Sequence, residues 1–561
     1  MVLYGAVHVR RIVMAVVHSD AGHLPKTDKL VSLPKLMSAY YTEFPDTGNP
    51  EQLVSFGTSG HRGSAFLHTF NEEHVYAITQ AVCDYRKENG IDGPLYMGGD
   101  THALSEAAFR TALEVLVAND VQVRIAYKDA FTTTPAISHA ILSWNAGKVS
   151  GLADGIVITP SHNPPQDGGF KYNPPHGGPA DTDVTSIIQN KANSYLMDGN
   201  RKVKRKNLSH ARAADCVKEH DFIAQYTEDL PKVIDMKAIQ NSGLHLGVDP
   251  LGGASLAFFE AIADRYKLDM TITNTVVDPT FRFVPCDKDG KIRMDCSSPY
   301  AMNGLLAMKD SFDLSFACDP DSDRHGIVTK QGLMNPNHYL SAVAWYLFTT
   351  RTNWPAGCGI GKTLVTTGLI DRVGAMLNRP VIEVPVGFKW FVPFLQSMRC
   401  GMGCEESAGA SFLCFDGTPW STDKDGPLLC LLACEMMAKE KRSPSEIYQG
   451  LTEKLGTPTY QRLDAPADSE TRKILKSLSK DSITMTTLGG SPIVSIQTHA
   501  SGNNAAIGGV KVQSKDGWFA VRPSGTEPIC KLYTECFSGE ETLQAIQKDA
   551  LAFMEKVLNK D

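Results

Sequence analysis

Three aspartates at alternate positions are candidates for binding a cation. Asp319, Asp321 and Asp323 follow an apolar run in the segment FACDPDSDRHG. In an extended chain this spacing points all three carboxylates to one side, where they repel one another unless a cation lies among them. Ligand sets made only of oxygen select a hard ion such as Mg²⁺. An EF-hand is excluded, because the sixth position of the loop is Arg324 instead of Gly and the twelfth is Lys330 instead of Glu.

A serine in a rigid turn is the candidate nucleophile. The segment GIVITPSHNPPQDGGFKYN (155–173) begins like a strand, and its prolines and glycines then fix a turn that exposes Ser161 and His162. Such a serine can act as a nucleophile or a phosphate carrier when a base and cations lie nearby, and His162 and Lys171 are the local candidates. On its own, a Ser-His pair is more often a turn in which the serine bonds to the local backbone.

Two further loops carry groups that suit a phosphorylated sugar. In GMGCEESAGASF (401–412), carboxylates beside exposed backbone suit sugar hydroxyls, and the alternative is an acidic pair at a helix start. In FAVRPSGTEPICKLY (519–533), a guanidinium, two hydroxyls and flexible backbone suit a phosphate monoester, and the alternative is a surface turn. The segment GTSGHRG (57–63) offers a similar set of hydroxyls and flexible backbone, with Arg62 as its cation. The candidate residues of the first two loops are Glu405, Ser407, Arg522, Ser524, Gly525 and Thr526.

One segment resembles a nucleotide-binding P-loop but is rejected. AGCGIGKT (356–363) has Ala356 where the first Gly is required, and a strand-like LVTT follows where the motif needs a helix. A nucleotide-driven enzyme is therefore not expected.

Alternating strand and helix signals position these loops. A helix is predicted after Asn71 as its capping residue, and a strand at 95–100, a helix at 105–120 and a strand at 121–127 follow it. The pattern recurs at 244–266 and again from 341–348 into a strand at 362–367, and the chain ends in a helix at 541–558. Successive α/β units with sheets between helices are therefore expected.

Length and composition indicate a multidomain globular protein. The 561 residues are 42% hydrophobic, and about 150 residues per domain gives about four domains. The net charge of -7 and the lack of aromatic residues in the basic stretch 200–215 exclude a generic nucleic-acid binder. No apolar run approaches the length of a membrane span. The thirteen scattered cysteines indicate reduced thiols in a cytoplasmic protein.

The N-terminus lacks the pattern of a signal peptide. Arg10 and Arg11 interrupt the apolar run that a signal peptide would need. We expect a loose N-terminal extension, with Met14 as an alternative start.

Five loops in a fixed order resemble one enzyme family. GTSGHRG, TPSHNPP, DPDSDR, CEESAG and RPSGTEP occur in this order, and from Gly57 onward the chain resembles the α-D-phosphohexomutase superfamily, most of all the long bacterial phosphoglucomutases. The resemblance implies three similar α/β domains with mixed sheets between helices, and a smaller C-terminal α+β domain, around a central cleft. The expected limits are an extension and helix at 1–45 and domains at 46–232, 233–337, 338–456 and 457–561.

The resemblance also implies a role for each loop. Ser161 would carry a phosphoryl group, and the three aspartates would hold Mg²⁺ together with an oxygen of the phosphoserine. Arg62, His162 and Lys171 would surround the reaction centre, and the general base stays open between His162 and Lys171. The implied substrate-binding residues are Arg324, Gly387, Lys389, Glu405, Ser407, Lys424, Arg522, Ser524, Gly525 and Thr526.

The implied activity interconverts glucose 1-phosphate and glucose 6-phosphate, with glucose 1,6-bisphosphate as intermediate and activator. Small sugar phosphates are the implied partners, and the oligomeric state stays open between a monomer and a homodimer. The loop EESAGA lacks the His ending of mannose-handling relatives, which favours glucose phosphates. A phosphomannomutase or dual-specificity phosphohexomutase, a phosphatase and a non-catalytic sugar-phosphate-binding relative are the alternatives. His102, where many relatives have Arg, is a departure that leaves the metal carboxylates in place.

Overall fold

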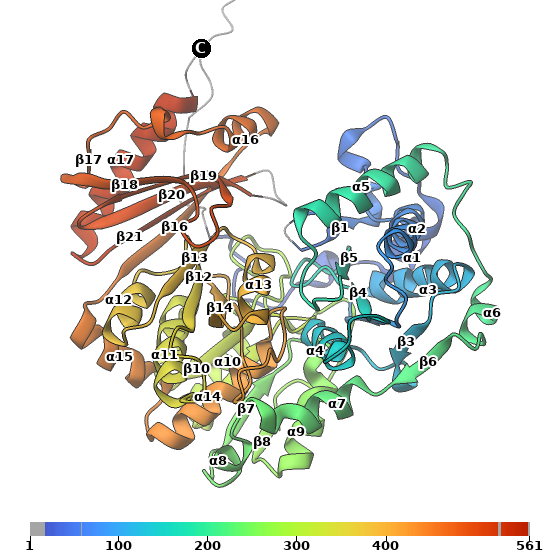
Figure 1. The fold of residues 1–561 in the computed structure, drawn as a ribbon, viewed down its shortest axis with the longest axis horizontal. Coiled ribbons are helices and arrows are strands. Elements are labelled where there is room, and N and C mark those ends of the chain that lie inside the picture. Colours follow the sequence, from blue (N-terminus) through green and yellow to red (C-terminus); the bar gives the residue numbers. More distant parts are fainter. Residues whose placement is uncertain (1–16, 58, 525–528, 559–561) are drawn as a thin grey trace, which may run out of the picture.

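Four sheets follow one another along the chain in the computed structural model, which describes residues 17–57, 59–524 and 529–558 (Figure 1). The first three sheets combine parallel and antiparallel pairs and are flanked by helices, whereas the fourth is antiparallel throughout. The predicted fold class is therefore confirmed. Each sheet falls within one of the predicted domains, whose limits stay a prediction. None of the described helices is long and apolar enough to cross a membrane.

The first sheet has the order β1-β5-β4-β2-β3-β6, and only β5 opposes the direction of its neighbours β1 and β4. The helix predicted at 105–120 begins two residues earlier, at Ala103. The Asp100 carboxylate accepts the backbone N–H of His102 just before the helix and the Ser105 hydroxyl in its first turn. The strands are β1 (His61–Ser64), β2 (Leu95–Gly99), β3 (Val123–Ala126), β4 (Asp154–Ile158), β5 (Asp167–Asn173) and β6 (Val217–His220). The helices are α1 (Leu33–Thr42), α2 (Glu72–Glu88), α3 (Ala103–Ala118), α4 (Thr134–Asn145), α5 (Thr182–Met197) and α6 (Leu208–Arg212).

The second sheet has the order β11-β10-β9-β7-β8, and the aspartate segment forms the turn between β9 and β10. The predicted strand and helix at 244–266 are confirmed as β7 and α9. The strands are β7 (Leu246–Asp249), β8 (Met270–Ile272), β9 (Leu314–Cys318), β10 (His325–Thr329) and β11 (Gly332–Leu333). The helices are α7 (Phe222–Asp229), α8 (Met236–Gln240), α9 (Ser255–Tyr266) and α10 (Asn303–Ala307).

The third sheet, β13-β12-β14-β15, corrects one prediction. The strand expected at 362–367 lies earlier, at β12 (Gly359–Thr363), and all of its residues are buried. Gly361 is in the packed interior, where a side chain would collide with Cys400 and Phe391. Gly359 and Gly361 of the P-loop-like segment are thus part of a buried strand, and LVTT leads into a helix. The other strands are β13 (Val381–Val384), β14 (Cys400–Glu405) and β15 (Gly409–Phe412). The helices are α11 (Pro336–Thr350), α12 (Leu369–Met376), α13 (Val392–Gln396), α14 (Gly426–Glu440) and α15 (Pro444–Leu455).

The fourth sheet has the order β16-β21-β20-β19-β18-β17 and packs against two helices around a core of its own. The predicted C-terminal helix at 541–558 is confirmed as α17. The strands are β16 (Thr459–Pro466), β17 (Thr487–Leu488), β18 (Ser491–His499), β19 (Ala506–Ser514), β20 (Gly517–Pro523) and β21 (Ile529–Cys536), and the helices are α16 (Ser469–Lys476) and α17 (Glu540–Leu558).

One large hydrophobic core joins the first three units. It includes Ile137 of α4, Phe316 of β9 and Leu429 of α14, so it reaches from the first unit through the second to the third. All thirteen cysteines are free thiols and twelve are buried, as the composition predicted. This shared core fixes the loops of the three units relative to one another.

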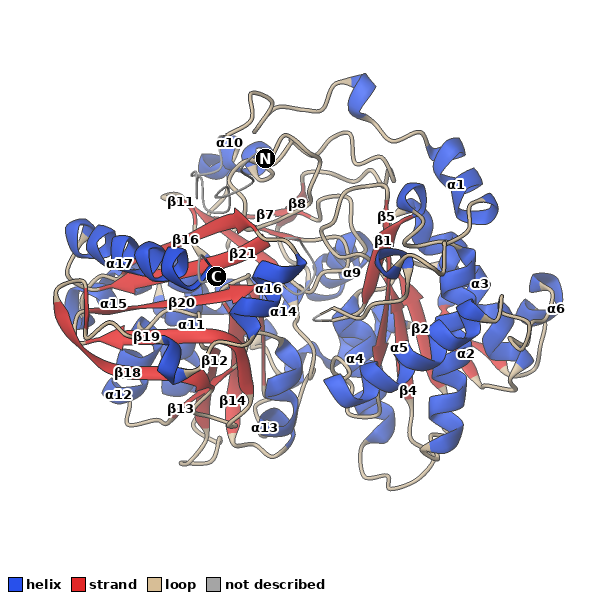
Figure 2. Cartoon of the chain, turned by 90° about the horizontal axis from the view of Figure 1, so that it is seen from above, coloured by secondary structure: helices blue, strands red, loops and turns tan. Residues whose placement is uncertain are grey.

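Residues 18–42, which we call the N-terminal strap, cross from the second unit to the first (Figure 2). The backbone N–H of His18 donates to the Lys288 carbonyl at 3.0 Å, and Lys29 Nζ donates to the Gly290 carbonyl at 3.1 Å. At the other end, Tyr40 of α1 is buried against α3. The expected loose extension is therefore attached from His18 onward, and residues 1–16 lie outside the described part of the chain.

Candidate active site

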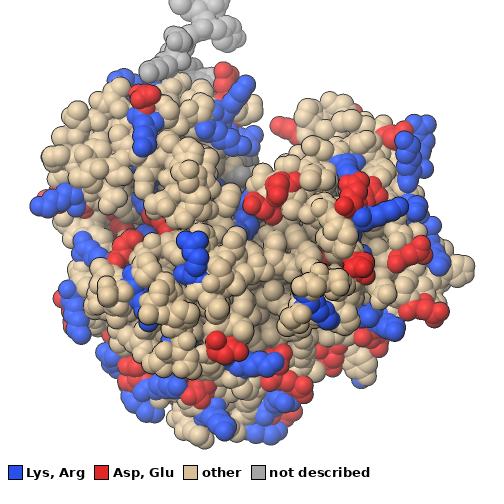
Figure 3. Space-filling view, in the orientation of Figure 1, with Lys and Arg blue, Asp and Glu red and all other residues tan. Residues whose placement is uncertain are grey.

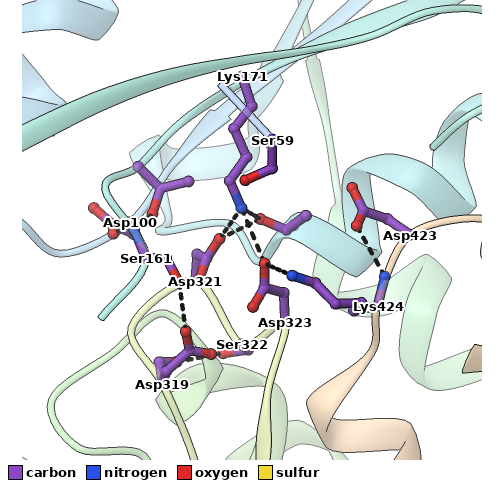
Figure 4. A network of polar contacts seen from close by, with 12 residues as sticks. Ser59, Asp100, Ser161, Lys171, Asp319, Asp321, Ser322, Asp323, Asp423 and Lys424 are labelled. Atoms are coloured by element: carbon purple, nitrogen blue, oxygen red, sulfur yellow. Dashed lines mark hydrogen bonds and ion pairs between the residues drawn. The ribbon is translucent and has the colours of Figure 1, made fainter. Parts of the chain in front are cut away.

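The three aspartates form one buried cluster in the turn between β9 and β10 (Figure 4). One oxygen from each carboxylate lies within 4.8 Å of the others. The turn is not extended, because Ser322 has a φ of 60° and its backbone N–H donates to the Asp319 carbonyl at 2.8 Å. A tight turn, and not the predicted alternation along an extended chain, gathers the carboxylates.

Two oxygens of this cluster receive no hydrogen bond from the described residues, which fits a metal site. They are the buried atoms Asp321 Oδ1 and Asp323 Oδ1. Burial and the negative charges of the other two aspartates raise the pKa of Asp319 well above its ordinary value. Buried carboxylate oxygens without a donor are expected to have a cation nearby, and a hard divalent ion prefers such ligands. The donor set therefore fits Mg²⁺.

Two lysines from other units bind the same cluster. Lys171 Nζ, on β5, donates to Asp321 Oδ2 at 2.6 Å and to Asp323 Oδ2 at 3.1 Å, and Lys424 Nζ lies 2.9 Å from Asp323 Oδ2. Burial opposes both charges, yet these contacts raise the pKa of Lys171 and hold the pKa of Asp323 well below its usual range. Lys171 therefore keeps its proton in this arrangement and is a poor proton acceptor.

Ser161 lies against this cluster and belongs to the turn that follows β4. Its side chain is buried, and Oγ donates to Asp319 Oδ2 at 2.7 Å. The backbone has a φ of 61°, and its N–H donates to Thr159 Oγ1 at 2.8 Å. His162 Nδ1 lies 3.3 Å from Ser161 Oγ, and burial followed by the charge of Arg324 lowers the pKa of His162 well below its ordinary value. The hydroxyl and the carboxylates thus share one site.

Arg62 and Arg324 add positive charge around this centre. Arg62, on β1, donates to Ser59 Oγ at 3.1 Å and to Asn163 Oδ1 at 3.5 Å, which places it beside the Ser161 turn. The backbone N–H of Arg324 donates to Asp319 Oδ1 at 3.0 Å, and its Nε lies 3.8 Å from Asp323 Oδ1. A group with several negative charges would therefore meet cations from several elements.

The predicted sugar loop lies in the tight connection between β14 and β15. Glu405 is the last residue of β14, so the alternative of a helix start is wrong. Its Oε1 accepts the backbone N–H of Gly387 at 2.9 Å, and burial raises the pKa of Glu405. Ser407 follows in the connection and is half-buried. Glu405 and Gly387 are thus brought together from separate segments.

Lys389 contacts the first unit. Its Nζ lies 3.1 Å from Asp181 and donates to the hydroxyl of Thr182, the first residue of α5. This predicted substrate-binding residue therefore joins the third unit to the first.

The predicted phosphate loop follows β20 in the C-terminal unit. Arg522 is on β20, where it pairs with Lys531 of β21. The backbone N–H of Ser524 donates to the Ile529 carbonyl at 2.8 Å and closes the base of the loop. Gly525 and Thr526 lie outside the described residues. Figure 3 shows the surface hollowed between the lobe of the C-terminal unit and the lobe of the first unit.

Sequence reasoning missed two polar residues that support the site. Asp100, which follows β2, accepts the Thr159 hydroxyl at 2.6 Å. Thr134, the first residue of α4, donates through its hydroxyl to Asp321 Oδ2 at 2.7 Å. For Asp100 the available signal was position, because polar residues just beyond parallel strands gather at the same edge of a sheet.

Comparison with known proteins agrees with this geometry. Four models of the phosphoglucomutase/phosphomannomutase family match in order: alpha/beta/alpha domain I at residues 53–197, domain II at 224–332, domain III at 335–455 and the C-terminal domain at 490–552. A phosphoglucomutase of Komagataeibacter xylinus is 56% identical over 531 residues, which cover 94% of this chain and 96% of that protein.

Two solved structures share the fold. Parafusin (phosphoglucomutase) from Paramecium, in an open form, superposes with a TM-score of 0.71 at 19% identity, covering 92% of this chain and 97% of that one. An Aspergillus fumigatus N-acetylphosphoglucosamine mutase in complex with GlcNAc-6P and magnesium gives 0.52 at 14% identity, covering 94% and 100%. Matched along nearly its whole length by a bacterial relative and by all four domain models, the chain belongs to the phosphoglucomutase/phosphomannomutase family.

Proposed function

We propose that the chain is a phosphoglucomutase in which Ser161 carries the phosphoryl group between the 1- and 6-positions of glucose. The observation that carries the proposal is the buried Ser161 hydroxyl, 2.7 Å from Asp319 in a cluster of three carboxylates. The 56% identity to the Komagataeibacter phosphoglucomutase supports glucose phosphates as substrates. Glucose 1,6-bisphosphate is then the intermediate, since the serine gives one phosphate and takes back the other.

Asp319, Asp321 and Asp323 would hold Mg²⁺, together with an oxygen of the phosphorylated Ser161. The two aspartate oxygens that accept no hydrogen bond from the described residues support this assignment, and the Aspergillus mutase of the same fold contains magnesium. When bound, the ion offsets negative charge on the phosphoryl group during transfer.

The chain's own residues position the reactants and balance their charge. Arg62 and Arg324 lie where they can neutralise the moving phosphoryl group, and the buried turn fixes the Ser161 oxygen that receives and releases it. Of the two predicted bases, the pKa shifts favour His162, because its ring is neutral and Lys171 holds its proton between two carboxylates.

A second phosphate site is needed because the intermediate has two phosphate groups. We assign it to Arg522, Ser524, Gly525 and Thr526, as the order of the family loops implies. Glu405 and Ser407 would bind sugar hydroxyls, with Gly387, Lys389 and Lys424 nearby. The bisphosphate must turn around so that each of its ends meets Ser161 in turn.

Arg522→Ala should raise KM for glucose 1-phosphate about 10- to 100-fold and change kcat little. The guanidinium would bind the phosphate that does not react, so its loss weakens ground state and transition state alike, by about 1.5–3 kcal/mol for a charge-assisted hydrogen bond. Steady-state kinetics tests this, with Lys473→Ala, at an exposed position on α16 of the same unit, as the control. A lower kcat at unchanged KM would contradict the assignment.

Sugar specificity separates the proposal from its nearest alternative. A phosphomannomutase or a dual-specificity enzyme would turn over mannose 1-phosphate at least as well as glucose 1-phosphate. We expect kcat/KM to favour glucose 1-phosphate, and steady release of inorganic phosphate would instead indicate a phosphatase. Parallel assays with the two sugars and a phosphate-release assay decide among the three.

A further inference from the structure

A buried ion pair lies behind the turn that carries Ser161. Asp100 follows β2 and His102 precedes α3, and both side chains are fully buried. The Asp100 carboxylate accepts four hydrogen bonds. They come from Thr159 Oγ1 at 2.6 Å, Ser105 Oγ at 2.5 Å, the backbone N–H of His102 at 3.0 Å and His102 Nδ1 at 2.8 Å. This carboxylate is fully satisfied by donors and is therefore ionised.

His102 uses both ring nitrogens as donors. Nδ1 faces the Asp100 carboxylate, and Nε2 lies 3.0 Å from the backbone carbonyl oxygen of Asn163. Both partners only accept, so both nitrogens must carry a proton and the ring is an imidazolium. Burial opposes this charge, but Asp100 and the Asn163 carbonyl together raise the pKa of His102 above its ordinary value.

The two residues hold both ends of the Ser161 turn. Asp100 fixes the Thr159 hydroxyl, which in turn accepts the backbone N–H of Ser161 at 2.8 Å. His102 fixes the carbonyl of Asn163, two residues beyond Ser161. Figure 4 shows Asp100 directly beside Ser161, on the side away from Asp321 and Asp323. Together the two residues hold a turn with an unfavourable backbone conformation, because Ser161 has a φ of 61°, in the left-handed region that a non-glycine residue rarely adopts.

We propose that Asp100 and His102 form a charged positioning pair that holds the Ser161 oxygen in place for phosphoryl transfer. The pair touches the turn and not the substrate, so it acts through Ser161. The inference rests on the proposed function, since it assigns a means of positioning to the proposed phosphate carrier. If the turn loses its bond to Asp100 or to His102, it can relax from its left-handed conformation. A displacement of about 1 Å at a reacting atom can lower the rate about 100-fold.

Three substitutions at His102 separate its two bonds. An asparagine places its amide near the position of Nδ1, so His102→Asn keeps the Asp100 contact and loses the Asn163 contact. A glutamine reaches the position of Nε2, so His102→Gln does the reverse. His102→Arg keeps a positive charge and can donate to both partners. We expect kcat to fall about 10- to 100-fold in the Asn and Gln variants with KM within about 3-fold, and to return to within about 5-fold of wild type in the Arg variant.

His139 provides a matched control. It is a buried histidine whose Nε2 lies 2.8 Å from Asp229 and whose Nδ1 lies 3.0 Å from the Trp420 carbonyl, so it has the same kinds of partners away from the Ser161 turn. His139→Asn should lower the thermal midpoint and leave kcat within about 3-fold of wild type. An equal loss of kcat in this control would assign the effect at His102 to general destabilisation and overturn the proposal.

Hydrogen exchange gives a readout that does not depend on turnover. In the unphosphorylated protein, the backbone amides of Ser161, His162 and Asn163 should exchange about 10-fold faster in the Asn and Gln variants than in wild type, and at the wild-type rate in the Arg variant. Should neither the Asn nor the Gln variant fold, Thr159→Val removes the hydroxyl that Asp100 holds, and the same changes in kcat and exchange are expected. Unchanged exchange with wild-type kcat in the folded variants overturns the inference. A wild-type protein without mutase activity would refute the proposed function. The exchange experiment would still decide whether Asp100 and His102 hold the Ser161 turn in place.

Discussion

Ser161→Ala is expected to abolish interconversion of glucose 1-phosphate and glucose 6-phosphate, by at least about 1,000-fold, because it removes the oxygen that would carry the phosphoryl group. The nearest hydroxyl in the same turn, that of Thr159, is already bonded to Asp100 and cannot substitute for it. The loss of one hydrogen bond to Asp319 costs about 1 kcal/mol of stability, so the variant should fold.

The assay must contain glucose 1,6-bisphosphate, so that an unphosphorylated enzyme does not appear inactive for lack of activator. Intact-protein mass spectrometry should detect one added phosphoryl group on wild type after incubation with the bisphosphate, and none on the variant. Ser38→Ala, at an exposed position on α1, is the matched control. Substantial turnover by Ser161→Ala under these conditions would refute the role of the serine.

Asp321→Asn is expected to lower kcat about 100- to 1,000-fold and to weaken the response of activity to Mg²⁺. Asp321 Oδ1 is a buried oxygen to which none of the described residues donates, and an amide in its place offers a weaker, neutral ligand of the same shape. The other oxygen accepts from Lys171 and Thr134, and Lys171 keeps its contact with Asp323 at 3.1 Å. The variant should therefore fold, with a moderately lower thermal midpoint.

Activity measured against Mg²⁺ concentration tests this prediction. A chelator should inactivate the wild-type enzyme reversibly, with activity restored by added Mg²⁺ and with little change in the thermal midpoint, because Lys171 and Lys424 already neutralise part of the cluster. Asp310→Asn, an exposed aspartate of the same unit, controls for the loss of one charge. A variant at position 321 with an unchanged magnesium response would remove the aspartate cluster from the mechanism.

The sequence predicted local features of the site better than contacts between distant segments. The aspartate cluster and the placement of Ser161 in a turn after a strand follow from short-range patterns, and both are present. The left-handed conformation of Ser161 and Ser322 could not be predicted, because it depends on hydrogen bonds that the folded turns supply. The apolar pattern also misplaced β12, since glycines in a buried strand carry no side chains to mark the strand.

Contacts across the fold lay beyond what the sequence indicated. Lys389 and Thr182 are 207 positions apart, and Lys171 and Asp321 are 150 positions apart. Asp100 was missed for the same reason, because its importance comes from Thr159, which is 59 positions away and on a different strand-turn unit. Such pairs are set by the order of strands in the sheets, and one sequence without relatives gives only weak information on that order.

The separate core of the fourth sheet has a consequence for how sugars enter and leave. Separating the first three units would expose their shared apolar core to water and would break the contacts of the N-terminal strap. The C-terminal unit meets the third unit through a much smaller apolar cluster, which includes Val365 and Trp518, and through polar contacts such as the 2.7 Å pair of Lys511 and Glu383. Opening the molecule at this boundary would expose less apolar surface than separating the first three units. We therefore expect sugar phosphates to enter and leave when the C-terminal unit rotates away from the other three.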